Sequence, residues 1–261
     1  MENMYVKYKK EYLDTKMYGG KKSSIKEIYF IRHGQTLWNQ QGKTQGQEAD
    51  IELNDIGINE AITTGKYLKK FRTIDKDFDC IISSPMLRCQ KTATIIAKEL
   101  EFSNDIIYND DIKEVKKGNM SGLTNKDELV TQLNKYASDK IKEIEDPIMK
   151  YNIENPYLAE EFYNRIIKEN KLDITGVETT HELLTRCNRF MNLLQQTKYK
   201  KIIVVSHSGL LDTLLKIIFK LNVLPKGDMT NGKNCSICYC KLKNNSFTMI
   251  SPQNTEHLAL Q

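Results

Sequence analysis

The chain has 261 residues, of which 39% are hydrophobic and 28% charged, an ordinary balance for a globular protein that buries a sizeable core. Its net charge of +5 comes mostly from residues 1–26, which carry seven lysines and three acidic residues, so the remainder is nearly neutral. Because the body of the chain is nearly neutral, we do not expect nucleic acid as a partner. We do not expect a membrane either, because no apolar run approaches the roughly 18 residues of a membrane span.

The six cysteines lack the density and regular spacing of a disulfide framework, and an apolar signal sequence is missing from the N-terminus. We therefore expect reduced thiols and a cytoplasmic protein. Cys235, Cys238 and Cys240 are clustered, but without a second cysteine or histidine pair nearby they predict strand residues and no metal site.

Residues 4–17 place Tyr5, Tyr8 and Tyr12 near one helical face and end at a glycine pair. We expect a short basic helix and a flexible linker over residues 1–26, followed by one domain over residues 27–261. The segment also resembles N-terminal stretches of many giant DNA virus proteins, in which tyrosine–lysine runs precede two glycines. That resemblance implies a virion location in place of a cytoplasmic one.

Apolar strands alternate with amphipathic helices along most of the domain. Strands are predicted at residues 27–31, 79–82 and 201–205, helices at 55–71, 86–100 and 209 to about 221, and a terminal hairpin at 236–242 and 247–250. Alternating strands and helices indicate an α/β fold, a three-layer αβα sandwich whose central sheet is mostly parallel.

The pattern changes at about residues 124–175, which are charged, helical in propensity and interrupted by Pro147 and Pro156. We interpret this stretch as a helical insert over one face of the domain. Its lysines could favour multiply phosphorylated substrates, although a solvated helix face is the interpretation that we favour.

Three groups of polar residues directly follow predicted strands, where open α/β sheets place their ligand crevices. The first is Arg32-His33-Gly34 with Thr36 and Asn39 close behind. The second is Ser83-Ser84-Pro85 with Arg88 in the first turn of the next helix. The third is Ser206-His207-Ser208-Gly209.

Phosphoryl transfer needs a nucleophile, cations around the phosphoryl oxygens and a proton for the leaving group. His33 can supply the first, while Arg32, Arg88 and His207 can supply the second. Glu114, in a loop between Ile112 and Gly118, can supply the third. Since no carboxylate cluster or glycine-rich lysine loop is present, we expect no metal and no cofactor.

These residues resemble the histidine phosphatase superfamily, in its phosphoglycerate-mutase-like branch. Residues 31–39 match the family pattern Arg-His-Gly-(Glu/Gln)-Thr-x-Trp-Asn. Further matches cover residues 27–260 in the family order: Gln45-Gly46, Ser83-Ser84-Pro85 with Arg88, Glu114 with Gly118 and Gly122, Gly176-Val-Glu178 with Arg186, Ser206-His207, and Asn234-Cys-Ser236.

The resemblance implies that His33, Glu114 and His207 are catalytic and that Arg32, Arg88, Asn39 and Ser208 bind phosphate. His33 would attack phosphorus, and Glu114 would protonate the leaving oxygen and then activate the water that hydrolyses phospho-His33. Asp212, which stands where the family frequently has arginine, is a departure that leaves the catalytic groups intact.

Four functions remain open at this point. Residues 124–175 contain only Arg165, so the adjacent arginine pair with which a glycolytic mutase holds its substrate carboxylate is missing, and hydrolysis is favoured over mutase chemistry. A phosphatase acting on small metabolites, one acting on phosphoproteins, and a non-catalytic module that binds a phosphorylated partner are the others. The intact nucleophile argues against the module. The oligomeric state is not indicated by the sequence.

Overall fold

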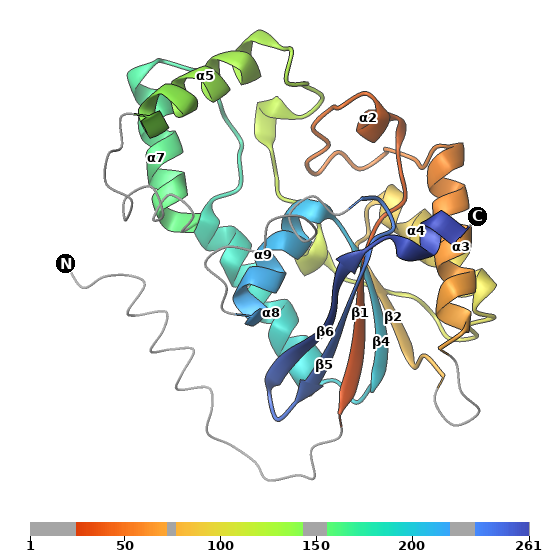
Figure 1. Cartoon of the computed structure of the whole chain (residues 1–261). Helices are drawn as coiled ribbons and strands as arrows, with labels where there is room; N and C mark the ends of the chain where they lie inside the picture. The colour runs from red at the N-terminus through yellow and green to blue at the C-terminus, as the bar shows by residue number, and fades with distance from the viewer. Residues whose placement is uncertain (1–24, 72–76, 143–155, 220–232, 261) are drawn as a thin grey trace.

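The computed structural model of the chain describes residues 25–71, 77–142, 156–219 and 233–260, and a six-stranded sheet lies at its centre (Figure 1). Its strands are β1 (Lys26–Arg32), β2 (Cys80–Ser83), β3 (Ile107–Tyr108), β4 (Lys201–Ser206), β5 (Ile237–Lys243) and β6 (Ser246–Asn254), in the spatial order β3-β2-β4-β1-β5-β6. The pairs among β3, β2, β4 and β1 are parallel, whereas β5 and β6 are antiparallel. The predicted α/β fold with a mostly parallel sheet is confirmed.

Helices connect the strands: α2 (Leu37–Gln40), α3 (Asp55–Lys69), α4 (Leu87–Glu99), α5 (Glu128–Lys142), α7 (Pro156–Glu169), α8 (Thr180–Gln196) and α9 (Ser208–Phe219). Short 3₁₀ turns are η1 (Asp110–Ile112), η2 (Gly118–Met120) and η3 (Glu256–Leu260). The predicted helices α3, α4 and α9 are confirmed to within a few residues. The end predicted for α9, near residue 221, lies outside the described residues.

Two layers of helices cover the two faces of the sheet (Figure 1). Because side chains alternate along a strand, Ile28 and Phe30 of β1 pack toward α8 and α9, whereas Tyr29 and Ile31 pack toward α3 and α4. All of β2 and β4 is buried, as expected for parallel strands covered on both faces.

The C-terminal hairpin extends the sheet beyond β1, as the sequence predicted. Asn244 and Asn245 connect β5 to β6 with φ angles of 51° and 58°. Asparagine tolerates this left-handed conformation, and two such residues in succession form the turn that matches the twist of a hairpin.

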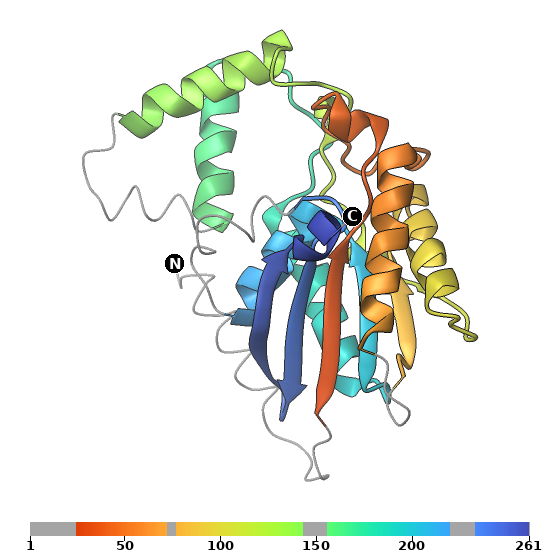
Figure 2. The same ribbon diagram turned by 45° about the vertical axis from the view of Figure 1, so that its right-hand side comes forward.

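The stretch interpreted as an insert holds α5 and α7, which lie beyond the carboxyl ends of the central strands (Figures 1 and 2). The two helices contact each other through a small apolar cluster of Ala137 and Ile166, joined by Leu133 and Tyr136. This cluster is separate from the two that sandwich the sheet, so the insert depends little on the main core.

The N-terminal helix and linker predicted over residues 1–26 lie outside the described residues, apart from their last two positions. β1 begins at Lys26, one residue before the expected start of the domain. All six cysteines are free and buried. Among the helices that the structure describes, none has the length and apolarity needed to cross a bilayer.

Candidate active site

The carboxyl ends of β1, β2 and β4 lie side by side and bring the three predicted polar groups together. Arg32 of β1 is in register with Ser206 of β4, and Ser83 of β2 is in register with Val205. The ladder continues one step beyond the strands, because the His33 amide donates to the Ser206 carbonyl at 2.9 Å. His33, Ser84 and His207 therefore begin their loops at the same edge of the sheet.

The His33 ring is buried, and its tautomer is set by its neighbour. Nδ1 lies 2.8 Å from the carbonyl oxygen of Gly34, and a carbonyl can only accept, so Nδ1 carries the proton. The lone pair is then on Nε2. Burial, followed by the guanidinium charges of Arg32 and Arg88, holds the pKa of His33 well below its ordinary value. The ring is thus a neutral imidazole with a nucleophilic Nε2.

The His207 ring lies edge-on to His33, with 5.3 Å between the ring centroids. Nδ1 accepts from the Arg88 Nε at 3.3 Å, because a guanidinium can only donate. Nε2 is then protonated and donates to the Ser84 hydroxyl at 2.8 Å. Burial and the Arg88 charge hold the pKa of His207 well below its ordinary value, so this imidazole is neutral as well.

Arg88 lies in the first turn of α4, as predicted. Its side chain is fully buried, and most of its donors are already engaged. Besides His207, its guanidinium binds the carbonyls of Gly46 and Glu48, each at 2.8 Å, and the sulfur of Met86. One of the two Nη1 protons is left for a ligand. In this structure Arg88 clamps the loop over residues 46–48 and adds positive charge beside both histidines.

Arg32 ends β1 and is largely buried beside His33. Burial lowers its pKa, while the carboxylates of Glu114 and Glu60 act in the opposite direction. Glu60 of α3 also accepts from the backbone amide of Gln35 at 2.7 Å. Arg32 is therefore close enough to Glu60 of α3 and to the loop residue Glu114 to interact with the charge of both carboxylates.

The loop after His33 packs directly on the start of α3, and two glycines make this possible. A Cβ on Gly34 would lie 2.4 Å from the Gly57 carbonyl oxygen, and one on Gly57 would lie 2.1 Å from that of Gln35. The Gly34 amide also donates to the Thr92 hydroxyl, which donates to the Arg88 carbonyl. The backbone after the nucleophile is thus fixed to α3 and α4.

Glu114 lies in the loop between η1 and η2, and its carboxylate caps the N-terminus of α9. Oε1 accepts from the amides of Val115 at 2.8 Å and Leu210 at 3.0 Å, and Oε2 accepts from Gly209 at 3.2 Å. A helix N-terminus favours such a negative charge. Since α9 starts at Ser208, directly after His207, this cap places Glu114 beside the second histidine.

The remaining predicted phosphate ligands, Asn39 and Ser208, lie at the margin of this cluster. Asn39 Oδ1 caps α2 by accepting from Thr36 and also accepts from Asn234 Nδ2 at 3.2 Å. Asn234 in turn binds the His33 carbonyl at 3.0 Å. Asn39 thus has a structural contact to the nucleophile loop, and its Nδ2 is the group left for a ligand. Ser208 is half-buried at the first position of α9.

Other residues at this site received no role from sequence reasoning. Ser84 binds His207 directly, although it was only quoted as part of a motif. Gln47 donates to the Glu114 carbonyl at 2.8 Å. Arg186 and Glu178 form a buried ion pair of 2.6 Å behind the Glu114 loop. Ser84, Arg186 and Glu178 could be noticed from the sequence because they lie in segments that match the family pattern. Gln47 only follows the matching pair Gln45-Gly46 and is not itself part of a match.

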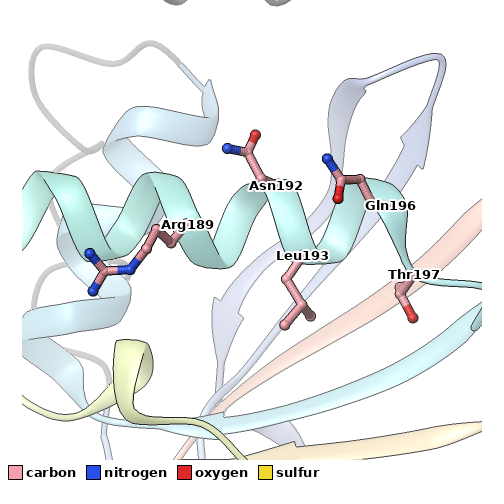
Figure 3. A pocket seen from close by; sticks show the side chains of 5 residues that line it. All are labelled: Arg189, Asn192, Leu193, Gln196 and Thr197. Atoms are coloured by element: carbon pink, nitrogen blue, oxygen red, sulfur yellow. The ribbon is translucent and has the colours of Figure 1, made fainter.

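A hollow elsewhere on the surface lies on α8, lined by Arg189, Asn192, Leu193, Gln196 and Thr197 (Figure 3). None of the histidines, arginines or the glutamate described above lines it, so we do not place the chemistry there. Within the described ranges, no group of three or more His, Cys, Asp and Glu side chains gathers as metal ligands would.

Comparison with known proteins identifies a family. The model described as "Histidine phosphatase superfamily (branch 1)" matches residues 28–166 and 149–255. A metal-independent phosphoserine phosphatase from Arabidopsis thaliana is 26% identical over 242 residues, which cover 91% of this chain and 85% of that protein. A 2,3-bisphosphoglycerate-dependent phosphoglycerate mutase from Buchnera aphidicola is 29% identical over 205 residues, or 75% and 85% of the two chains.

Among solved structures, a phosphoglycerate mutase from Bacillus anthracis superposes with a TM-score of 0.67 at 19% identity, covering 91% of this chain and 96% of that one. At this identity the likeness shows the fold alone. The sequence relatives include both a phosphatase and a mutase, so the choice between the two activities depends on the site itself.

Proposed function

The chain belongs to the histidine phosphatase superfamily, branch 1, and we propose that it is a metal-independent phosphomonoesterase that works through a phosphohistidine on His33. The observation that carries the proposal is the state of His33. Its ring is buried and neutral with Nε2 as the free nitrogen, beside two arginines and a second neutral histidine. A nucleophile kept unprotonated next to fixed cations suits attack on an anionic phosphate ester.

In the first step His33 Nε2 forms a bond to phosphorus while the bond from phosphorus to the leaving oxygen breaks. Arg32 and the remaining Nη1 proton of Arg88, whose Nε binds His207, stabilise the charge on the phosphoryl oxygens. Glu114 enters this step in its protonated form and gives that proton to the leaving oxygen, which leaves Glu114 as the carboxylate. Its Oε2 accepts only one long hydrogen bond, so we assign the transferable proton to that oxygen.

In the second step Glu114 takes a proton from water, whose oxygen bonds to phosphorus as the bond to Nε2 breaks. Inorganic phosphate and the neutral His33 are regenerated. The hydrogen bond from Nδ1 to the Gly34 carbonyl stabilises the ring in one orientation through both steps, since the same nitrogen must attack and leave.

Hydrolysis is favoured over mutase chemistry by the composition of the insert. Arg165 is the single arginine in residues 124–175, and its exposed side chain lies 4.0 Å from Glu169 on the same helix. A single arginine placed beside Glu169 does not supply the two adjacent guanidinium groups that would hold a substrate carboxylate. We propose small phosphorylated metabolites as substrates, with phosphoproteins as the second candidate because of the lysines in the insert.

The experiment is phosphate release from p-nitrophenyl phosphate, phosphoserine, phosphoglycerates and sugar phosphates in the presence of EDTA. We expect hydrolysis by the unmodified protein and its loss in His33→Ala. His181→Ala, at the exposed start of α8, is the matched control and should retain activity.

Three results would contradict the proposal. Equal activity in His33→Ala would mean another nucleophile, and an absolute requirement for 2,3-bisphosphoglycerate would establish the mutase. Absence of turnover on every substrate would favour a phospho-ligand binding module.

A further inference from the structure

We propose that Gln47 is a positioning residue that fixes the proton donor Glu114 relative to the phosphate-binding Arg88. The inference rests on the function proposed above, in which Glu114 acts as acid and base. Gln47 lies in the loop between α2 and α3, outside the strand ends that carry the other groups.

The three-residue stretch 46–48 contacts both Glu114 and Arg88. The Gln47 Nε2 donates to the Glu114 carbonyl at 2.8 Å. The carbonyls on either side, those of Gly46 and Glu48, accept from Arg88 at 2.8 Å each. A shift of this stretch would therefore move the acid loop and the guanidinium relative to each other.

A buried ion pair also holds the Glu114 loop. Arg186 of α8 donates to the carbonyls of Asp111, Lys113 and Glu114, the last at 3.2 Å. Glu178 pairs with Arg186 and accepts from the Lys116 amide. Both side chains of this pair are 8% exposed.

The Arg186–Glu178 ion pair and the Gln47 hydrogen bond have different consequences. Arg186 and Glu178 attach the Glu114 loop to α8, which stabilises the fold on that side. Gln47 attaches the same carbonyl to the loop that Arg88 holds. The Gln47 contact links the backbone of the proton donor to the stretch that Arg88 holds, so its loss should affect proton transfer more than folding.

A glutamine amide at position 47 is required because the partner is a carbonyl oxygen. Gln47→Glu keeps the size and shape of the side chain but replaces the N–H donor by an oxygen that repels the carbonyl. Gln47→Leu removes the donor without adding charge. Gln40→Glu is the matched control, because Gln40 is an exposed residue at the end of α2.

The test is the dependence of kcat/KM on the leaving group, measured with p-nitrophenyl phosphate and phenyl phosphate. This ratio reports the transfer to His33, and nitrophenolate departs with little help from an acid whereas phenolate needs a proton. Glu114→Gln serves as the reference, and its kcat/KM for phenyl phosphate should fall by about 100-fold or more relative to its value for the nitrophenyl ester.

For Gln47→Glu and Gln47→Leu we expect kcat/KM to fall about 10-fold on phenyl phosphate and no more than about 3-fold on the nitrophenyl ester. The reason is that Glu114 is still present but is displaced from the leaving oxygen. Gln40→Glu should match the unmodified protein on both. Melting temperatures within a few degrees of the unmodified protein would show that the Gln47 variants fold.

The outcomes distinguish the positioning role of Gln47 from the acid role of Glu114. Equal losses on both substrates in the Gln47 variants, with the expected selectivity in Glu114→Gln, would overturn the inference and leave the proposed function standing. Equal losses in Glu114→Gln itself would remove the acid role of Glu114 together with the inference. Folding failure of both Gln47 variants would contradict the claim that this contact serves positioning.

Discussion

At the scale of single residues, the site depends on keeping two histidines neutral next to two guanidiniums. Burial accounts for most of the lowered pKa of His33, and Arg32 and Arg88 add to it by disfavouring the imidazolium. The same arrangement acts on His207. A cationic ring would have no lone pair on Nε2, so in the proposed mechanism the arginines that bind the substrate would also keep the nucleophile unprotonated.

Removing the Arg32 charge should raise the pKa of His33. Arg32→Met keeps most of the side-chain volume but takes away the largest charge contribution to the lowered value, so the imidazolium becomes easier to form. An NMR titration of the imidazole signals measures this directly. Arg189→Met, which changes an exposed arginine on α8, is the control and should leave the titration unchanged.

If the pKa of His33 stayed the same in Arg32→Met, burial and the Arg88 charge would account for its neutral state without Arg32. The proposed electrostatic link between Arg32 and the nucleophile would then be wrong.

Sequence reasoning predicted that the polar residues after three strands would meet, because strand ends converge at one edge of a parallel sheet, and the structure brings them together. It could not show how their donors are used. The engagement of Arg88 with Gly46 and Glu48 depends on a loop conformation that lacks a periodic signal. The Gln47 contact to Glu114 joins residues 67 positions apart, and no local pattern encodes it.

At the scale of secondary-structure elements, the position of the nucleophile loop depends on its packing against α3. Asn54 caps that helix by accepting from the Gly57 amide at 2.9 Å and also donates to the Gln35 side chain. The backbones at Gly34 and Gly57 approach too closely for any side chain. The start of α3 therefore sets the position of the loop that follows His33.

Gly57→Ala should force this interface apart. The added Cβ would meet backbone atoms of Gln35 at 2.1–2.8 Å, and backbone cannot give way as a side-chain end can. We expect a loss of about 1–3 kcal/mol in the free energy of unfolding, typical of overpacking, together with reduced kcat. Ile58→Ala, at an exposed neighbouring position, is the comparison.

Urea denaturation of the two variants measures the effect. A Gly57→Ala protein as stable and as active as Ile58→Ala would show that α3 does not set the loop.

The elements that the sequence predicted are those with long apolar periods, such as β4 and α9. The two-residue strand β3 is exposed at the sheet edge, and α2 spans a single turn, so neither carries a pattern. Lys26, counted with the N-terminal segment, instead caps α8 by donating to the carbonyls of Leu194, Gln195 and Thr197. That contact exists only once the sheet has brought distant segments together.

At the scale of the whole molecule, the C-terminal turn η3 closes the fold beside α3. His257 is buried there, stacks on Tyr67 with 5.0 Å between ring centroids, and binds the Thr64 hydroxyl at 2.9 Å. Burial lowers its pKa from 6.5 to about 4. These contacts give His257 a structural role.

This pKa predicts acid destabilisation. Between pH 6.5 and about 4 the unfolded chain binds a proton at His257 that the folded chain excludes, so stability is complete above pH 6.5 and falls as the pH drops through that window. The loss from this residue is about 3 kcal/mol. The lowered pKa values of His33 and His207 add losses of the same sign.

Urea denaturation midpoints at pH 7.5 and at pH 5 measure how much stability the protein loses between these two pH values. His257→Gln should be less stable at pH 7.5 but show a smaller drop toward pH 5 than the unmodified protein. An identical drop in the two proteins would mean that His257 does not titrate on unfolding.

The most direct test of the central claim is to capture the phosphoryl group on His33. The Glu114→Gln variant is mixed with p-nitrophenyl phosphate, denatured in alkali, where phosphohistidine survives, and digested for mass spectrometry. The account predicts one added phosphoryl group on the peptide that contains His33, and none in His33→Ala. Turnover without any phosphorylated peptide, or with the label on another residue, would contradict the account.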